Sequence, residues 1–249
     1  MSKPVRRAKS EFAIFQLLPN MLTIGAICAG LTAIRYGVQG HYLLAVQLIL
    51  VASVLDGLDG RLARLLGADS KMGAELDSLA DFLNFGVAPA LIVYFWALQD
   101  VRGAGWIAAL VYAVCCVVRL ARFNVAGKSE EAEEGTGEFF VGVPAPAGAL
   151  LVMLPMYLSF AFEDARLLPS VVNGVYVVLI GLLMISHIPT WSFKTIRISR
   201  GNVKFFLVGF AFVAAAFWTY AWITLSVFCF AYAVMVVKAW FTYRKALKG

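Results

Sequence analysis

Residues 56–81 read DGLDGRLARLLGADSKMGAELDSLAD, a stretch that places charged side chains in or beside two apolar segments. Four of these side chains are the aspartates Asp56, Asp59, Asp77 and Asp81. Asp56 precedes Arg64 by eight residues, which corresponds to about 12 Å of helix. Its carboxyl group therefore falls inside the apolar segment, where an ionisable group is costly and indicates a functional site.

The spacing of the aspartates predicts two helices whose acidic faces meet. Within each helix the two aspartates are three or four residues apart, so they lie on one face. Gly73 extends the second of these faces, four residues before Asp77. Because the connection 65–73 is short, it turns the second helix back antiparallel to the first. We therefore expect the four carboxylates to converge at one end of the helix pair.

Convergence of four carboxylates predicts a divalent-metal site. Like charges at short range do not all stay ionised unless cations neutralise them. Oxygen ligands alone are typical of Mg²⁺, Mn²⁺ or Ca²⁺ and not of zinc. Two metal ions held by carboxylates are common in phosphoryl transfer, so we expect a site for two Mg²⁺ or Mn²⁺ ions. A surface loop with helix caps is the alternative, and it fits Asp69 and Ser70 better than the four spaced aspartates.

Small and basic residues accompany the aspartates. Gly60, Ala63 and Gly73 leave room for a bulky substrate to approach the backbone. Arg64 can bind a phosphate group through two parallel hydrogen bonds.

The composition indicates a membrane protein. Of the 249 residues, 61% are apolar and only 14% are charged, with a mean hydropathy of +0.82. Soluble domains contain about 45–50% apolar and about 25% charged residues. Such an excess excludes a disordered chain and argues against a soluble globular one. The four cysteines all lie in apolar segments, and they match neither a disulfide framework nor a metal-ligand spacing.

Recurring apolar segments predict an all-α, polytopic membrane helix bundle of about eight transmembrane helices. We place the spans at 18–37, 42–64, 74–98, 105–125, 143–162, 168–187, 203–219 and 221–240. The predicted organisation is a basic N-terminal segment 1–17, a single transmembrane catalytic domain 18–240 and a basic cytoplasmic tail 241–249. Within the domain, 18–162 is the core and 163–240 supplies additional helices. Segment 1–17 is either an interfacial helix or an ordered tail.

The distribution of positive charge predicts that both termini and the acidic site lie on the cytoplasmic side. If the N-terminus is cytoplasmic, 18 of the 21 Lys and Arg residues lie on the cytoplasmic side of the membrane. Only Arg35, Arg102 and Arg166 lie on the opposite side. The net charge of +6 is therefore explained by cytoplasmic loops, and we expect no nucleic-acid partner.

The chain resembles the CDP-alcohol phosphatidyltransferase family. The family pattern D-x2-D-G-x2-A-R-x8-G-x3-D-x3-D is filled without departure by Asp56, Asp59, Gly60, Ala63, Arg64, Gly73, Asp77 and Asp81. The resemblance implies that the first three aspartates bind metal, and that Asp81 lies at the metal site and is the general base. It also implies that the glycines, Ala63 and Arg64 shape a pocket for the CDP and phosphate groups of CDP-diacylglycerol.

Four further stretches resemble the branch of this family whose acceptor alcohol is L-serine. They are LPNMLTIGAICAGLTAIR (18–35), DFLNFGVAPALIVY (81–94), RLARFNV (119–125) and FVGVPAPAGA (140–149). The resemblance implies L-serine as the second substrate, a homodimer, and a multi-pass protein of the bacterial inner (cytoplasmic) membrane.

Polar residues near the predicted site are further candidates. Arg119 and Arg122, three residues apart, hold the serine carboxylate or a lipid phosphate, or they anchor the helix at the membrane surface. Asn84 and Asn124 are either polar substrate contacts or interhelical hydrogen bonds. Asn20 and Thr23 contact the nucleotide or satisfy the start of the first helix.

Other functions remain open at this level. A related enzyme would use glycerol 3-phosphate, inositol phosphate or choline in place of serine. A cation-coupled transporter would also place aspartates in the membrane, but usually near the midplane and on several helices. A scaffold without chemistry leaves the aspartate spacing unexplained.

Overall fold

The protein is described by a computed structural model that covers residues 17–68, 70–128, 139–162, 167–186, 188–191 and 203–246. The predicted interfacial helix 1–17 lies outside the described residues except for Leu17. The first part of the predicted tail 241–249 continues the last helix.

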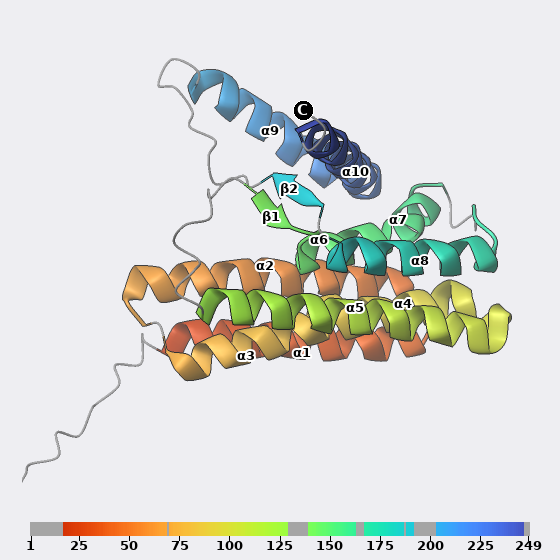
Figure 1. Ribbon diagram of the computed structural model, residues 1–249, viewed down its shortest axis with the longest axis horizontal. Helices are drawn as coiled ribbons and strands as arrows, with labels where there is room; N and C mark the ends of the chain where they lie inside the picture. The colour runs from red at the N-terminus through yellow and green to blue at the C-terminus, as the bar shows by residue number, and fades with distance from the viewer. Residues whose placement is uncertain are drawn as a thin grey trace, which may run out of the picture.

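The described residues are helical apart from one short ribbon of two strands (Figure 1). In chain order the helices are α1 (Leu18–Val38), α2 (Tyr42–Leu66), α3 (Lys71–Asp81), α4 (Ala88–Val93), α5 (Arg102–Lys128), α6 (Ala145–Val152), α7 (Leu154–Ala161), α8 (Ser170–Ile185), α9 (Val203–Thr219) and α10 (Ala221–Ala246). Two π-helical turns (Phe82–Val87 and Tyr94–Leu98) and a 3₁₀ turn (Gln99–Val101) make Lys71–Val101 one continuous helix. Strands β1 (Phe139–Val141) and β2 (Pro189–Trp191) pair antiparallel. The all-α prediction is confirmed, and all eight predicted segments are helical.

Five helices of the described residues are long and apolar enough to cross a membrane, which supports a multi-pass membrane protein. They are Leu18–Val38, Tyr42–Leu66, Lys71–Val101, Gly103–Val125 and Ala221–Thr242. The predicted count of eight is not reproduced. The predicted span 143–162 is divided between α6 and α7 at Met153, because Pro155 cannot continue the hydrogen-bonded ladder. Helix α8 and Leu207–Thr219 are apolar but shorter.

Helices α1, α2, α5 and the continuous helix Lys71–Val101 lie side by side along the bundle (Figure 1), and α6, α7 and α8 add further buried side chains to its core. Small residues let these helices approach closely, as is usual in membranes. The buried face of α1 is a stripe of small side chains: Thr23, Ala26, Gly30, Ala33 and Gly37. At Gly37 an added Cβ would lie 3.2 Å from Cγ1 of Ile92, so a larger residue would push α1 away from α4.

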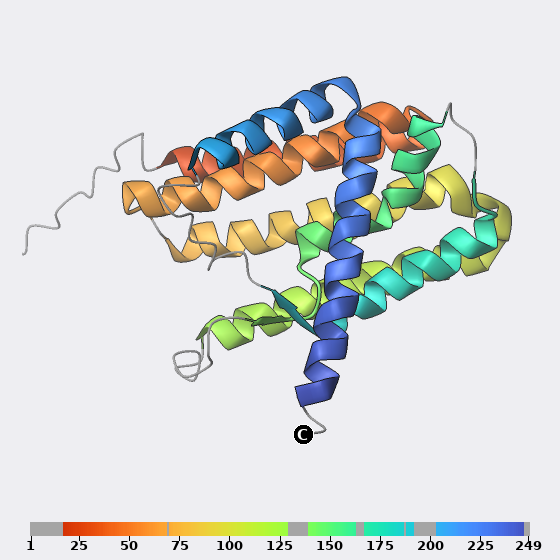
Figure 2. The ribbon, with the colours of Figure 1, turned by 90° about the horizontal axis from the view of Figure 1, so that it is seen from above.

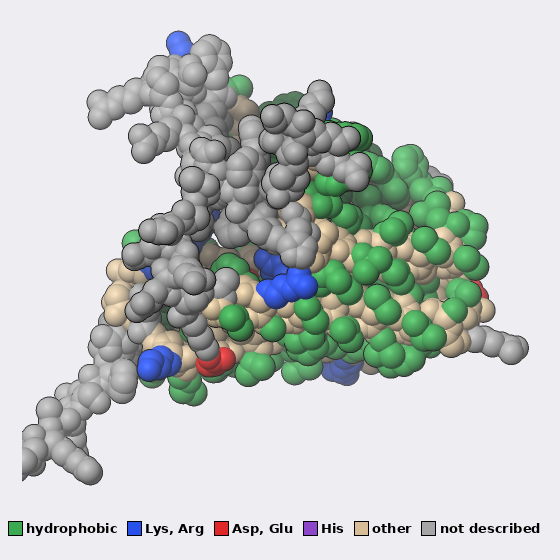
Figure 3. All heavy atoms as spheres, viewed as in Figure 1, with side chains coloured by type: hydrophobic (Ala, Val, Ile, Leu, Met, Phe, Trp, Pro, Cys, Tyr) green, Lys and Arg blue, Asp and Glu red, His purple; other side chains and the backbone are tan. Residues whose placement is uncertain are grey.

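The outer surface of the bundle is strongly apolar. Large hydrophobic side chains are exposed on every long helix, from Val54 on α2 to Phe230 on α10. Figure 3 shows them spread over the face of the bundle seen in Figure 1. Contiguous apolar surface of this kind is stable in lipid and not in water.

Helix α10 corresponds to the last predicted span, 221–240. Figure 2 shows that it crosses the other helices of the bundle steeply. The cause is its docking on α7, where Trp222 contacts Tyr157 and Phe160 with ring centroids 6.2 and 5.0 Å away. Such aromatic contacts form between distant parts of the chain, so the hydropathy pattern does not reveal them.

Candidate active site

A cavity of about 200 Å³ opens at the left-hand end of the bundle in Figure 1, where the start of α1, the end of α2 and the start of α3 meet. The residues around it come mostly from the predicted motif and from α1. They are Pro19, Asn20, Thr23, Asp59, Gly60, Ala63, Ala68, Ser70, Gly73, Ala74 and Asp77. Segments separated by some fifty residues thus form one cavity, which is lined by two of the motif aspartates.

Three of the four motif aspartates form a compact cluster beside this cavity. One carboxylate oxygen from each of Asp56, Asp59 and Asp77 lies within 4.8 Å of the others. The cluster forms because the turn at Gly67 and Ala68 sets α3 against α2 with both acidic faces inward. Oxygens this close repel one another in their ionised form, and a bound cation removes that repulsion.

The structure holds Asp59 in one orientation. The Thr23 hydroxyl donates a hydrogen bond to Asp59 Oδ2 at 2.5 Å, and the Gly60 N–H donates to Asp59 Oδ1 at 2.6 Å. Asp59 is only 3% exposed, so these donors are what offsets the burial of its carboxylate. Thr23 therefore has a role that the sequence did not indicate: it orients an aspartate from a neighbouring helix.

Asp81 lies one helical turn beyond Asp77, outside the cluster of three. Its carboxyl group is close enough to interact electrostatically with the carboxyl group of Asp56 and with the Arg119 guanidinium. Asp81 thus connects the acidic cluster to the arginine on α5.

Glycine and serine define the floor of the cavity. A Cβ on Gly73 would lie 3.0 Å from both Asn20 Oδ1 and Ser70 Oγ, so a larger residue here would have to displace these two side chains. A Cβ on Gly60 would meet nothing within 4 Å, because this position faces open space. Ser70 caps α3 by accepting a hydrogen bond from the Gly73 N–H at 2.9 Å.

The sequence places Ser70 in a surface loop with helix caps and does not mark it as a site residue. The sequence did contain a signal for its role as a helix cap. Serine is a preferred N-cap residue, and Ser70 directly precedes the first residue of α3. Pro19, Ala68 and Ala74 also line the cavity, but nothing in their sequence context marks them.

Arg64 does not line the cavity. Its side chain is exposed, and Nε donates to the Gly60 carbonyl oxygen of its own helix at 3.0 Å.

The three polar candidate residues on α5, Arg119, Arg122 and Asn124, differ in their hydrogen-bond partners. Arg122 Nη1 donates to the carbonyl oxygen of Ile185, 2.9 Å away at the end of α8. Asn124 Nδ2 donates to Ser78 Oγ on α3 at 3.0 Å, an interhelical hydrogen bond. Arg119 Nε is buried and has no hydrogen-bond partner among the described residues.

Asn84 lies in the π-helical turn after Asp81 and is fully buried. Both of its amide atoms lack hydrogen-bond partners in the described part of the chain. Its side chain faces Gly30 of α1, where any larger residue would collide with it. The structure does not place Asn84 at the cavity.

The acidic cluster fits a divalent cation. All its ligand atoms are carboxylate oxygens, the donor type that Mg²⁺ and Mn²⁺ prefer. In addition, Asp56 Oδ1 is buried without a hydrogen-bond partner among the described residues, as expected for an atom that awaits a ligand.

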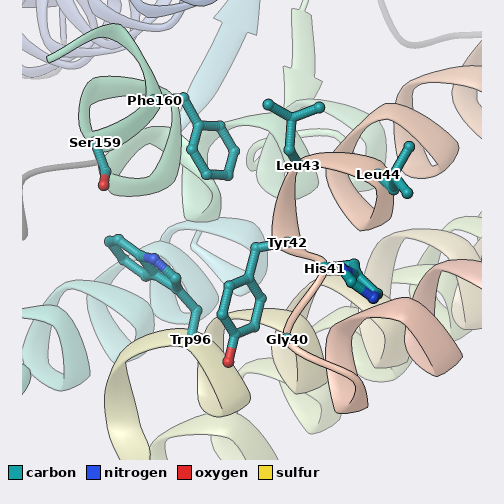
Figure 4. Close-up of a pocket in the computed structure, with 8 residues that line it drawn as sticks. All are labelled: Gly40, His41, Tyr42, Leu43, Leu44, Trp96, Ser159 and Phe160. Carbon is teal, nitrogen blue, oxygen red and sulfur yellow. The ribbon is translucent and has the colours of Figure 1, made fainter. Parts of the chain in front are cut away.

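A second cavity, of about 410 Å³, lies at the opposite end of α2 (Figure 4). It is bordered by the turn that contains His41, by Trp96, and by Ser159 and Phe160 of α7. None of its lining residues is a carboxylate, so it lacks the chemistry of the acidic site.

Taken together, the fold and the site define a class of protein: a multi-pass helical membrane protein with a cavity and an acidic cluster, able to hold a cation, at one end of its bundle. Comparison with known proteins identifies the family. The family model described as CDP-alcohol phosphatidyltransferase matches residues 16–184, and the chain belongs to this family.

Individual relatives agree with this assignment. The chain is 43% identical over 211 residues to a CDP-diacylglycerol–serine O-phosphatidyltransferase of Mycobacterium leprae, covering 84% of this chain and 70% of that protein. It is 34% identical over 224 residues to the protein of the same name from Helicobacter pylori, covering 90% of this chain and 91% of the relative. A Bacillus subtilis protein of that name is 34% identical over 186 residues, covering 74% of this chain and 98% of the relative.

Proposed function

We propose that this protein transfers the phosphatidyl group of CDP-diacylglycerol to L-serine and releases CMP. The supporting observation is the arrangement of the family motif, which gathers three aspartates and two glycines at one cavity beside α1. The printed names of relatives with 34–43% identity favour serine as the acceptor.

The diphosphate of the lipid substrate would occupy the cavity, with its acyl chains in the membrane. The N-terminus of α3 borders the cavity, and free N–H groups at a helix start favour phosphate. Asn20 lines the same cavity and offers an amide to the nucleotide. Gly60 leaves the space in which these groups fit.

Divalent cations complete the proposed site. Two Mg²⁺ or Mn²⁺ ions, held by Asp56, Asp59 and Asp77 with Asp81 at the edge, would neutralise the diphosphate and the charge that develops on CMP. Thr23 and Gly60 keep the Asp59 carboxylate turned toward this position.

Asp81 is the proposed general base. Its carboxylate accepts the proton of the serine hydroxyl, and the hydroxyl oxygen forms a bond to the lipid-side phosphorus. The bond from that phosphorus to the bridging oxygen breaks, and CMP leaves with the electron pair. Asp81 suits this role because it adjoins the acidic cluster without belonging to its compact core.

The acceptor would approach from α5. Arg119 lies within electrostatic range of Asp81 and has a buried Nε without a hydrogen-bond partner among the described residues, so it can receive the serine carboxylate. Arg122 is engaged with the end of α8 and is better explained as a structural contact.

The proposed setting is the bacterial inner membrane, with the acidic cavity and both termini on the cytoplasmic side. The asymmetry of Lys and Arg supports this orientation. Eight crossings, expected from the apolar segments, and a homodimer, implied by the family resemblance, remain predictions.

The decisive experiment is a CMP-release assay on purified protein with CDP-diacylglycerol and Mn²⁺ or Mg²⁺. The acceptors are serine, glycerol 3-phosphate, inositol phosphate and choline, tested in turn. Serine-dependent release that a chelator abolishes is expected. If CMP is released only with another alcohol, that alcohol and not serine is the acceptor. If folded protein releases no CMP with any acceptor, the proposed activity is rejected.

A further inference from the structure

Helix α10 lies beyond residues 16–184, the part of the chain that the family model matches. It nevertheless docks firmly on the bundle through one stripe of side chains. Leu225, Cys229 and Val236 are buried on this stripe, and the Cys229 thiol lies 3.6 Å from the Leu150 carbonyl oxygen. Together with the stacking of Trp222 on α7, these contacts fix the rotation of α10.

Tyr232 belongs to the same stripe, since it follows Cys229 by three residues and precedes Val236 by four. It packs partly buried against the core. Its phenol lies within electrostatic range of the Arg119 guanidinium on α5. Arg119 is therefore within electrostatic range both of Asp81 and of a tyrosine from the crossing helix.

Both groups present buried polar atoms that the described residues leave unsatisfied. Arg119 Nε and the Tyr232 hydroxyl each lack a hydrogen-bond partner among them. Orphaned polar atoms of this kind are uncommon in folded proteins and cost free energy unless a ligand or water satisfies them. One of them belongs to Arg119, which is within electrostatic range of the proposed general base Asp81, and the other belongs to Tyr232, which is within electrostatic range of Arg119. Two orphaned donors linked in this way indicate a place for a ligand.

We propose that Tyr232 and Arg119 together bind the carboxylate of the acceptor amino acid, which makes Tyr232 a specificity-determining residue supplied by α10. Both side chains offer hydrogen-bond donors, and a carboxylate is a strong acceptor with two oxygens. An amino acid held in this way directs its hydroxyl group toward Asp81. The inference rests on the proposed function, because it assigns the acceptor subsite of that reaction.

The test compares Tyr232→Phe with wild type in the CMP-release assay, at varied serine and at varied CDP-diacylglycerol. The substitution removes one hydroxyl group and keeps the ring that packs on the core. We expect the KM for serine to rise about tenfold, as for loss of a hydrogen bond to a charged group. The kcat and the KM for CDP-diacylglycerol should change less than twofold, on the order of the effect of a surface substitution.

A second acceptor separates carboxylate binding from a structural effect. L-Serinamide keeps the hydroxyl and amino groups of serine but lacks the carboxylate. Tyr232→Phe should therefore reduce the preference of the enzyme for serine over serinamide by the same factor by which it raises the serine KM. A general loss of activity with both acceptors would overturn the proposal.

Tyr157→Phe is the matched control. Its hydroxyl is also buried without a partner in the described residues, but it lies on α7 beneath Trp222. Its serine KM should stay at the wild-type value. An unchanged serine KM in Tyr232→Phe, with active wild type, would overturn only the subsite. Wild type that releases no CMP with serine would overturn the proposed function and the subsite with it.

Discussion

At the scale of single residues, Asp81 and Asp77 differ in position although they share one helix face. Asp77 belongs to the compact cluster, whereas Asp81 reaches toward Asp56 and Arg119. We expect Asp81→Asn to lower kcat by about 10²–10⁴-fold, the usual contribution of a general base, with CDP-diacylglycerol binding largely retained. Initial rates of CMP release and a binding isotherm measure the two effects.

Glu75→Gln is the control for this substitution. It removes the same charge from an exposed position of α3 and should leave kcat unchanged. Substantial turnover by the Asp81→Asn variant would show that Asp81 is not the general base.

Thr23 offers a second test at this scale, because its hydroxyl contacts Asp59 from another helix. Thr23→Val keeps the shape and removes the donor, so the Mn²⁺ concentration for half-maximal activity should rise about tenfold, as for loss of a hydrogen bond to a charged group. Titration of activity with Mn²⁺ measures this concentration.

Thr32→Val is the control on the same helix. The Thr32 hydroxyl donates to the Cys28 carbonyl oxygen of α1 itself, away from the cavity. If both valine variants require the same Mn²⁺ concentration as wild type, Thr23 does not organise the metal site.

At the scale of elements, the corner at Gly142 joins the ribbon to α6 and α8. Gly142 has φ +82°, and its N–H donates to the Ile188 carbonyl oxygen at 2.8 Å. An added Cβ would lie 2.5 Å from the Met184 carbonyl oxygen. Gly142→Ala should therefore lower the free energy of unfolding by about 2 kcal/mol, from left-handed backbone strain and the clash. Thermal unfolding in detergent measures the loss.

Gly209→Ala is the comparison for this element, since an added Cβ on Gly209 in α9 would meet nothing within 4 Å. Alanine in a helix interior is neutral or favourable relative to glycine. Equal unfolding midpoints for the two alanine variants would show that the corner tolerates a side chain.

At the scale of the whole molecule, the charge asymmetry predicts which end of the bundle faces the cytoplasm. In a Cys28→Ser background, a membrane-impermeant thiol reagent should label Lys71→Cys only in inside-out vesicles. Gln39→Cys, in the turn at the other end of α2, should be labelled only in right-side-out vesicles. A permeant reagent controls for reactivity, and the reverse pattern would invert the proposed topology.

The sequence predicted what depends on local periodicity. Apolar runs located the eight helical segments, and spacings of three and four residues placed the aspartates on common faces. The break at Met153 is also a local effect, and Pro155 would have predicted it. By contrast, the crossing of α10 and the pairing of β1 with β2 depend on contacts between distant segments, which periodicity does not encode.

The same division applies to the site. The motif aspartates were found by spacing, whereas the partners of Arg122 and Asn124 became visible only when α8 and α3 were placed beside α5. Tyr232 lies 113 residues from Arg119 along the chain and carries no motif. Its location beside the arginine follows only from the fold.

The π-helical turn Phe82–Val87 has a consequence for how this helix compares with others. A π turn accommodates one more residue than an α turn, and one residue corresponds to about 100° of rotation. The turn therefore sets the angular offset between the face with Asp77 and Asp81 and the later face that buries Ile92. A homologous helix without the π turn would need one residue fewer between its last aspartate and its first core residue to keep both faces aligned. In a correct alignment with such a homologue, a one-residue gap would fall at this turn.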